Sequence, residues 1–243
     1  MKLRIFNICL LVLVFMASCK TKSSNSKYNT YPDIQVAGAM KNVMWKGKLG
    51  GIINLDTISN KKGLYGLGPV SYLTGELLIV DGKTYISRVV DSATMSVEEN
   101  SKIDAPFFVY GNANEWQKEK LPADVTDIAS LEEFIDSKTK EFKRPFIFKL
   151  KGNVNYADIH IQNLPKGTMV SSPDEAHSGQ VNYDLENEEV EIIGFFSTEH
   201  QAVFTHHDSY MHMHLITKDR SNMGHLDKVE FTAIQVELYL PVK

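Results

Sequence analysis

The sequence predicts an α+β fold, with a few helices in the N-terminal part and a mostly antiparallel β-sheet after them. Apolar residues recur at intervals of three and four near the start of the chain. Beyond about residue 145 they alternate with polar residues in short runs that Gly, Pro or Asn separate. Helices and strands therefore do not alternate along the chain, and a parallel βαβ arrangement is not expected.

Helices and a strand outside the hairpin described next are predicted before residue 140. Residues 35–57 carry apolar positions at helical spacing, which predicts two short amphipathic helices. Residues 106–110 (PFFVY) form a β-prone apolar run, which predicts a strand. Ser130 and Glu133 have the spacing of a capping box ahead of an apolar pair, so a helix of about ten residues is expected there.

The clearest local signal for strands is a hairpin. Two β-prone runs, residues 76–80 and 84–89, flank the pair Asp81-Gly82, and glycine accepts the positive φ that a tight turn requires. Later in the chain, six runs with period-two character predict further strands. They are residues 146–150, 157–161, 190–193, 202–205, 211–216 and 229–240.

Composition is that of a folded globular protein. The 243 residues are 43% hydrophobic and 23% charged, which excludes disorder, collagen and coiled coil. The formal net charge is -4, and the body of the chain has no dense Lys/Arg block, so a nucleic-acid partner is not expected. Two cysteines cannot form a disulfide scaffold.

The N-terminus predicts export. Lys2 and Arg4 precede an apolar run, residues 5–17, that is too short to span a bilayer and is typical of a signal peptide. The run ends in small residues before Cys19, which resembles the lipobox of bacterial lipoproteins and implies cleavage before Cys19 and a lipid on its sulfur. Ordinary secretion with an unmodified Cys19 is the alternative. Cys9 leaves with the signal in both cases.

Three parts of the chain follow from this interpretation. Residues 1–18 are the predicted signal peptide of an exported, membrane-anchored lipoprotein. Residues 19–33 are a predicted flexible tether, because this stretch is rich in Ser, Lys and Asn. Residues 34–243 are expected to form one domain, which contacts the membrane only through the N-terminal lipid.

Histidines gather near the C-terminal end. In Met211-His-Met-His-Leu215, strand alternation places His212 and His214 on one face. His225 follows a predicted turn and is the candidate third ligand of a metal site. Three neutral imidazoles leave coordination positions for water or substrate, which is typical of catalytic zinc. An incidental polar face of an edge strand is the alternative for the H-x-H pair.

The other histidines of the C-terminal half are weaker candidates. His206 and His207 could compete as ligands, but on a strand only one of two adjacent side chains faces a site. His200 and His177 lie in polar segments, and we expect them to be solvated.

Several motifs, in order along the chain, resemble the bacterial alpha-acetolactate decarboxylase family. They are the glycine-rich residues 65–68, the L-x-G-E-L segment at 73–77 followed by residues 80–82, and an H-x-H…D-R…G-H motif at 212–225 whose third histidine follows the second by eleven positions. Residues 145–148, 164–165 and 193–195 match further landmarks. The resemblance implies a barrel-like core and a homodimer.

The resemblance also implies a reaction and its residues. His212, His214 and His225 become zinc ligands, and Glu76 becomes the active-site glutamate. The family decarboxylates 2-hydroxy-2-methyl-3-oxobutanoate (2-acetolactate) to acetoin. Zinc suits this reaction because loss of CO₂ from a β-keto acid leaves electrons on an enediolate, whose charge a chelating cation stabilises. Glu76 would orient the substrate or relay a proton; an exposed strand carboxylate is the alternative for this residue.

Three positions depart from the family pattern. Pro69 replaces a threonine, which removes a hydroxyl and a backbone donor. Gln162 aligns with an arginine, so a fixed positive charge for the substrate carboxylate is lost. Only 18 residues follow His225, so a C-terminal extension that carries another glutamate has no counterpart. Glu230 and Glu237 are the candidates to replace that glutamate.

Three functions remain after this comparison. A zinc-dependent carbon–carbon lyase acting on a small 2-hydroxy-3-oxo acid is the expected function. The alternative is a metal-binding lipoprotein of the same fold with lost or altered activity. A different metal-dependent hydrolase or isomerase is the third, although neither H-E-x-x-H nor G-x-S-x-G occurs in the chain.

Overall fold

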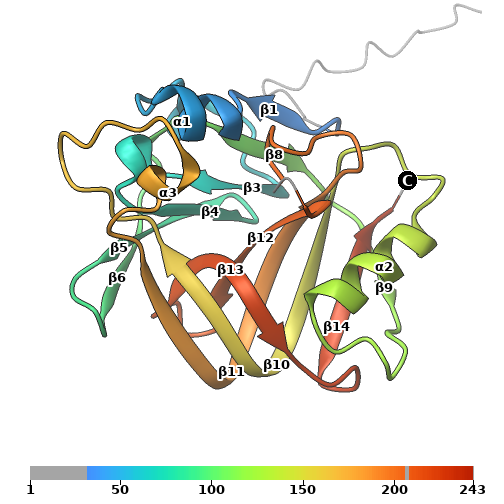
Figure 1. Ribbon diagram of the computed structural model, residues 1–243. Coiled ribbons are helices and arrows are strands. Elements are labelled where there is room, and N and C mark those ends of the chain that lie inside the picture. Colours follow the sequence, from blue (N-terminus) through green and yellow to red (C-terminus); the bar gives the residue numbers. More distant parts are fainter. Residues whose placement is uncertain (1–31, 206–207, 243) are drawn as a thin grey trace, which may run out of the picture.

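The computed structural model describes residues 32–205 and 208–242 (Figure 1). Within these ranges the chain forms two six-stranded antiparallel sheets, a two-stranded sheet and three α-helices, which confirms the predicted α+β class. No helix in the same ranges is long and apolar enough to cross a membrane. The predicted signal peptide, Cys9, Cys19 and residues 20–31 of the tether lie outside the described residues, as do His206 and His207.

The first sheet contains the predicted hairpin. Strands β4 (Glu76–Val80) and β5 (Lys83–Val89) pair around Asp81 and Gly82, whose φ angles of 47° and 85° suit a two-residue turn. The strand predicted at 106–110 is also present, displaced by two residues. The strand order is β1 (Gln35–Ala37), β8 (Phe108–Asn112), β3 (Leu64–Pro69), β4 (Glu76–Val80), β5 (Lys83–Val89) and β6 (Met95–Glu99).

The second sheet closes on itself, and β10 is the strand that closes it. One edge of β10 (Phe146–Ile161) pairs with β11 (Val181–Phe196) along its whole length, and the other edge pairs with β14 (Val236–Pro241) and then with β13 (Met223–Glu230). Because β11, β12 and β13 also pair in sequence, these strands form a barrel-like ring. The strand order is β11 (Val181–Phe196), β12 (Met211–Thr217), β13 (Met223–Glu230), β10 (Phe146–Ile161), β14 (Val236–Pro241) and β9 (Trp116–Glu119).

Some predicted strands have other boundaries. The runs at 146–150 and 157–161 are the two ends of β10, because Gly152 continues the strand where a Cβ would lie 2.1 Å from the carbonyl oxygen of Gln235. The run at 229–240 is divided between β13 and β14. The strand predicted at 202–205 is wrong: Ala202 has a φ of 58°, and these residues form a turn.

The helices also differ from the prediction. Only one α-helix, α1 (Met40–Lys46), forms in residues 35–57, because Gly47 adopts a φ of 57° and ends it. The chain then forms β2 (Ile53–Asn54), which pairs with β7 (Asp104–Ala105), and a 3₁₀ turn, η1 (Leu55–Thr57).

Helix α2 (Ile128–Lys138) begins earlier than predicted. Asp127 is its N-cap, and Ser130 completes the capping box three residues later, so Ser130 is the partner of the cap and not the cap itself. A four-residue helix, α3 (Pro173–Ala176), lies beyond residue 145, where only strands were predicted. A further 3₁₀ turn, η2 (Ser71–Leu73), precedes β4.

The two large sheets pack against each other through apolar side chains. Leu67, Leu78 and Val109 of the first sheet meet Ile193 and Phe195 of the second, and all five are fully buried. Burying each such side chain stabilises the fold by roughly 1.5–3 kcal/mol. In Figure 1 the first sheet lies above the barrel-like sheet, α1 and α3 lie side by side at one edge, and α2 lies beside the second sheet.

Candidate metal centre

Three neighbouring strands place histidines in one row. In β12, His212 and His214 share a face because successive side chains alternate. His225 of β13 lies directly opposite His214, and His160 of β10 lies opposite His225 on its other side. All four side chains are buried. Gly224 permits this close approach, because a Cβ there would lie 2.6 Å from the carbonyl oxygen of His160.

The three histidines expected to bind metal are close enough to share one ion. Their candidate ligand atoms all lie within 4.8 Å of one another. The His212 Nε2 and His225 Nδ1 atoms are 3.1 Å apart. Two nitrogens on one tetrahedral Zn²⁺, each about 2.05 Å from the ion, lie about 3.3 Å apart. The donor set therefore fits a zinc ion, which the three imidazoles would hold.

Glu76 is buried beside this group. It is the first residue of β4, and its Oε2 atom lies 3.7 Å from His214 Nε2. Its Oε1 atom accepts a hydrogen bond of 3.2 Å from the backbone N–H of Gln162. The side chain is 3% exposed, so the alternative of an exposed strand carboxylate is wrong.

Burial also increases the proton affinity of the Glu76 carboxyl. Loss of solvent raises the pKa of its carboxyl well above the ordinary value. The hydrogen bond from Gln162 opposes this rise, and the negative charge of Asp227 adds to it. A bound cation would reverse the balance, because positive charge beside a carboxyl favours its ionised form.

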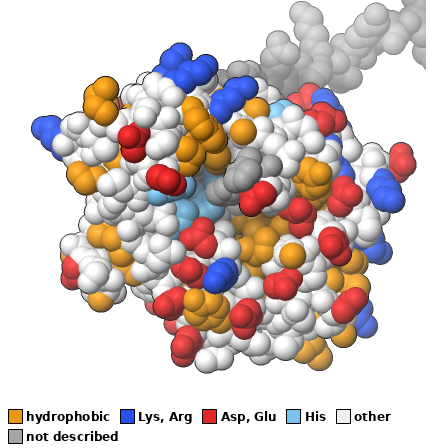
Figure 2. Space-filling view, in the orientation of Figure 1, with side chains coloured by type: hydrophobic (Ala, Val, Ile, Leu, Met, Phe, Trp, Pro, Cys, Tyr) orange, Lys and Arg blue, Asp and Glu red, His pale blue; other side chains and the backbone are white. Residues whose placement is uncertain are grey.

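A cavity of about 30 Å³ lies at the centre of these residues, enough for a water-sized molecule. Figure 2 shows histidine side chains at the base of a hollow on this face of the molecule. No Lys or Arg is among the residues, all within the described ranges, that line the cavity. They are Met40, Met44, Pro69, Leu73, Glu76, Phe107, His160, Gln162, His177, His212 and His225.

The positions that depart from the resembled pattern lie at this cavity. Pro69 pairs with Glu76 across β3 and β4, and Gln162 follows β10. The two glutamates considered as replacements do not line the cavity. Glu237 binds Lys118 and Tyr239 through its carboxylate, and Glu230 is exposed near the end of β13. Neither Glu230 nor Glu237 is therefore among the described residues at this cavity.

His160 is a histidine of the cavity that the sequence analysis did not single out. Its ring centroid lies 4.6 Å from that of His225, and its Nδ1 atom lies 2.7 Å from an oxygen of Asp227. His160, His225 and Asp227 are a second group whose ligand atoms lie within 4.8 Å of one another. The available signal was the histidine itself, which alternates with apolar residues in the run 157–161.

The two histidines expected to be solvated have different surroundings. His177 is exposed, as expected, but it also lines the cavity, and its ring centroid lies 6.3 Å from that of His160. His200 is half-buried, with Nδ1 2.8 Å from the Ser197 hydroxyl and its ring beside Phe204. Of these two, His177 belongs to the candidate site.

Solved structures with similar folds are known. The structure of alpha-acetolactate decarboxylase from Bacillus subtilis strain 168 matches 85% of this chain and 83% of its own length, with a TM-score of 0.68 and 20% identity. A Staphylococcus aureus protein of unknown function, described as similar to alpha-acetolactate decarboxylase, matches with a TM-score of 0.66 and 17% identity over 85% of this chain and 84% of its own. At these identities the likeness establishes the fold.

Sequence comparison establishes the family. The alpha-acetolactate decarboxylase of Brevibacillus brevis is 23% identical over 223 residues, which cover 88% of this chain and 75% of that protein. The family model for alpha-acetolactate decarboxylase matches residues 35–240, which include both sheets except Pro241 at the end of β14, and every residue that lines the cavity. The chain therefore belongs to the alpha-acetolactate decarboxylase family.

Proposed function

We propose that this protein decarboxylates 2-acetolactate to acetoin at a zinc site formed by His212, His214 and His225, with Glu76 as the active-site acid–base group. One observation carries the proposal. In a member of this family, three buried imidazoles converge within reach of one ion beside a buried carboxyl. That donor set leaves coordination positions for a substrate, as catalytic zinc sites do.

The surroundings of the three imidazoles suit this chemistry. A bound Zn²⁺ supplies Lewis-acid stabilisation of the negative charge that develops on substrate oxygens as CO₂ leaves. Glu76 is buried beside His214, with its Oε2 atom 3.7 Å from His214 Nε2, so its carboxyl can exchange a proton with a substrate held at the three imidazoles. Met40, Met44 and Phe107 form an apolar wall that excludes water from the reacting carbon.

The direct test is an acetoin assay. We expect the purified protein to convert racemic 2-acetolactate to acetoin above the spontaneous rate, to lose this activity with a chelator, and to regain it with zinc. His200→Ala is a matched control, since His200 is a histidine outside the cavity. Absence of acetoin from protein that carries a full complement of zinc would contradict the proposal.

A second candidate function is metal or ligand binding with lost or altered turnover. The small cavity without a lining Lys or Arg in the described chain favours it, as do Pro69 and Gln162 at the cavity wall. The double substitution Gln162→Arg and Pro69→Thr separates the two functions. A gain in acetoin formation would favour an enzyme with shifted specificity, whereas an inactive, zinc-loaded double variant would favour a binding protein.

We further propose that the protein is an exported lipoprotein anchored through Cys19 and that its domain forms a homodimer. The N-terminal sequence supports the anchor, and the family resemblance supports the dimer. Cys19→Ser should move the protein from the membrane fraction to the soluble fraction of expressing cells. Light scattering on the domain should give twice the mass of one chain; a single-chain mass would contradict the dimer.

A further inference from the structure

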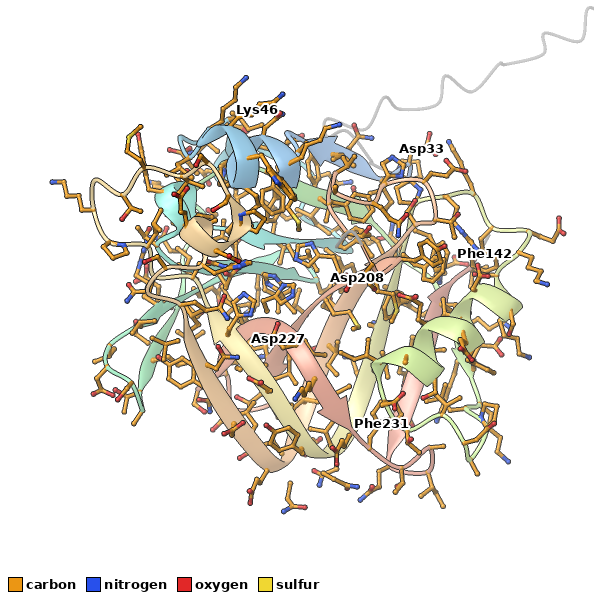
Figure 3. The ribbon with its side chains drawn as sticks, viewed as in Figure 1. Asp33, Lys46, Phe142, Asp208, Asp227 and Phe231 are labelled. Carbon is orange, nitrogen blue, oxygen red and sulfur yellow. The ribbon has the colours of Figure 1, made fainter. Side chains whose placement is uncertain are left out.

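A ring of side-chain hydrogen bonds adjoins one wall of the cavity. His160 Nδ1 lies 2.7 Å from Asp227 Oδ2, and His160 Nε2 lies 3.4 Å from the amide nitrogen of Gln162. The same amide nitrogen donates to Gln180 Oε1 at 3.4 Å. Gln180 donates to Asn182 at 3.0 Å, and Asn182 donates back to Asp227 at 3.2 Å. Figure 3 labels Asp227, the carboxylate at which the ring closes.

Carboxylates determine the direction of every bond in this ring. A carboxylate accepts hydrogen bonds and does not donate them. The amide nitrogen of Asn182 therefore faces Asp227 and also Asp158, whose Oδ1 lies 2.8 Å away. The amide oxygen of Asn182 must then face the nitrogen of Gln180, and the oxygen of Gln180 must face the nitrogen of Gln162.

The His160 side of the ring gives the same orientation. Asp227 accepts from Nδ1 of His160, so Nδ1 carries a hydrogen, and Nε2 of the neutral imidazole is an acceptor. That acceptor faces the amide nitrogen of Gln162. The two N–H groups of Gln162 therefore point to two acceptors, His160 Nε2 and Gln180 Oε1, and the amide cannot turn over without losing both contacts.

This orientation leaves one atom unsatisfied. Oε1 of Gln162 is buried and has no hydrogen-bond partner among the described residues. Gln162 is 4% exposed and lines the cavity beside Glu76 and His225. A buried carbonyl oxygen without a donor is costly, and such atoms are rare in folded proteins. A ligand in the cavity that offers a donor would remove this cost.

We propose that Gln162 is a specificity-determining residue, whose Oε1 atom accepts a hydrogen bond from a hydroxyl group of the substrate. The inference rests on the proposed function, whose substrate carries a hydroxyl on the carbon next to the carboxylate, and it assigns Gln162 as the residue that recognises this hydroxyl. An acceptor oxygen repels a carboxylate, so the carboxylate of the substrate lies away from Gln162. A site built to bond a hydroxyl discriminates strongly against the analogue that lacks it.

Binding of two stable acids tests the inference without turnover. The probes are 2-hydroxy-2-methylbutanoate and 2-methylbutanoate, which differ by the hydroxyl. The measured ratio is the dissociation constant of 2-methylbutanoate divided by that of 2-hydroxy-2-methylbutanoate, both determined by calorimetry on zinc-loaded protein. Metal chelation by the hydroxyl contributes to the ratio in every variant, so the change in the ratio reports on Gln162. We expect Gln162→Met to reduce the ratio about tenfold.

A second substitution avoids the cavity. Gln180→Ala removes the acceptor that orients Gln162, and we expect it to reduce the ratio about threefold. Gln117→Ala, on the exposed surface of β9, is the matched control and should leave the ratio unchanged. Thermal melts identify any variant that does not fold, and Gln180→Ala then decides the outcome.

The outcomes separate this inference from the proposed function. Protein that makes no acetoin but shows the expected fall in the ratio would refute the decarboxylase proposal and support the role of Gln162. Unchanged ratios in Gln162→Met and Gln180→Ala would overturn the inference. So would a wild-type protein that binds the hydroxy acid no better than the acid without the hydroxyl.

Discussion

Two buried ionisable side chains, Lys149 and Glu76, have contrasting surroundings. The Lys149 ammonium lies 4.1 Å from the ring centroid of Trp116 and 5.4 Å from those of Tyr65 and Tyr239, and it donates to the Tyr65 hydroxyl. Burial lowers its pKa, but the aromatic faces attract its charge in the folded chain. The protein's own aromatic side chains therefore stabilise the Lys149 charge, and no ligand is needed to do so.

Glu76 lacks such compensation. Within the described chain it has one backbone donor, from Gln162, and one nearby imidazole, His214, and no Lys or Arg forms an ion pair with it. A buried carboxylate without a cation is destabilising. A buried charge that the protein's own side chains compensate, such as that of Lys149, has a structural role. A buried carboxyl without a cationic partner, such as that of Glu76, marks the place where a cation is expected to bind.

The largest expected effect is loss of metal from the Glu76 region. His214→Ala should reduce both zinc affinity and acetoin formation by more than about a hundredfold, because it removes a ligand held among buried groups. Metal analysis after dialysis, combined with the acetoin assay, measures both. A variant that retains zinc at the wild-type level would contradict the assignment of His214.

Zinc should also stabilise the folded protein. A ligand that binds only the folded state adds about 2.7 kcal/mol at a free concentration one hundred times its dissociation constant. For a chain of this size, that raises Tm by roughly 5–10 °C. The increase should be equal in wild type and Lys149→Met and absent in His214→Ala. A zinc-induced shift in His214→Ala that equals the wild-type shift would place the ion elsewhere.

A moderate effect is expected from pH in the metal-free protein. The pKa of Glu76 is raised above 4.5 in the folded state, so the folded state binds the proton more tightly and is stabilised below pH 4.5. That stability is lost as the pH rises from 4.5 through the folded pKa. Glu76→Gln has no charge to bury, so with chelator at pH 7.5 it should melt about 2–4 °C above wild type.

The same variant supplies its own control. Near pH 4 both Glu76 and its glutamine replacement are neutral, and the two proteins should melt at the same temperature. Acetoin formation by Glu76→Gln should be lost in the presence of zinc at every pH. A variant that melts below wild type at pH 7.5 would show that ionised Glu76 is stabilised by groups other than a metal.

The smallest effect is expected at Lys149. Lys149→Met removes cation–π attraction and also the cost of burying the charge, so the free energy of unfolding should change by about 1 kcal/mol or less. Zinc content and acetoin formation should be unchanged. Urea unfolding and metal analysis test both statements, and loss of zinc would mean that the two regions are not independent.

Local sequence predicted those parts of the structure that depend on nearby residues. The Asp81-Gly82 hairpin and the shared face of His212 and His214 follow from turn chemistry and strand alternation. His225 could be placed because β12 and β13 are joined by a short turn. The roles of these histidines remain predictions.

Contacts between residues that are far apart in the sequence could not be predicted from the local sequence around either residue. His160 lies opposite His225 only because β10 pairs with β13, which is far away in sequence. Nothing in residues 157–161 indicates that partner. A distant contact also explains the wrong prediction at 202–205. These residues are β-prone, but Ala202 has a left-handed backbone and forms a turn. The turn places the Val203 carbonyl oxygen at the N-terminus of α1, where it accepts a hydrogen bond from the Met40 N–H.

The most direct test of the account is a zinc titration of the metal-free protein with 2-acetolactate as substrate. We expect acetoin formation to rise with added zinc and to saturate at about one ion per chain, the stoichiometry of a single three-histidine site. Protein that binds one zinc per chain and still forms acetoin only at the spontaneous rate would contradict it.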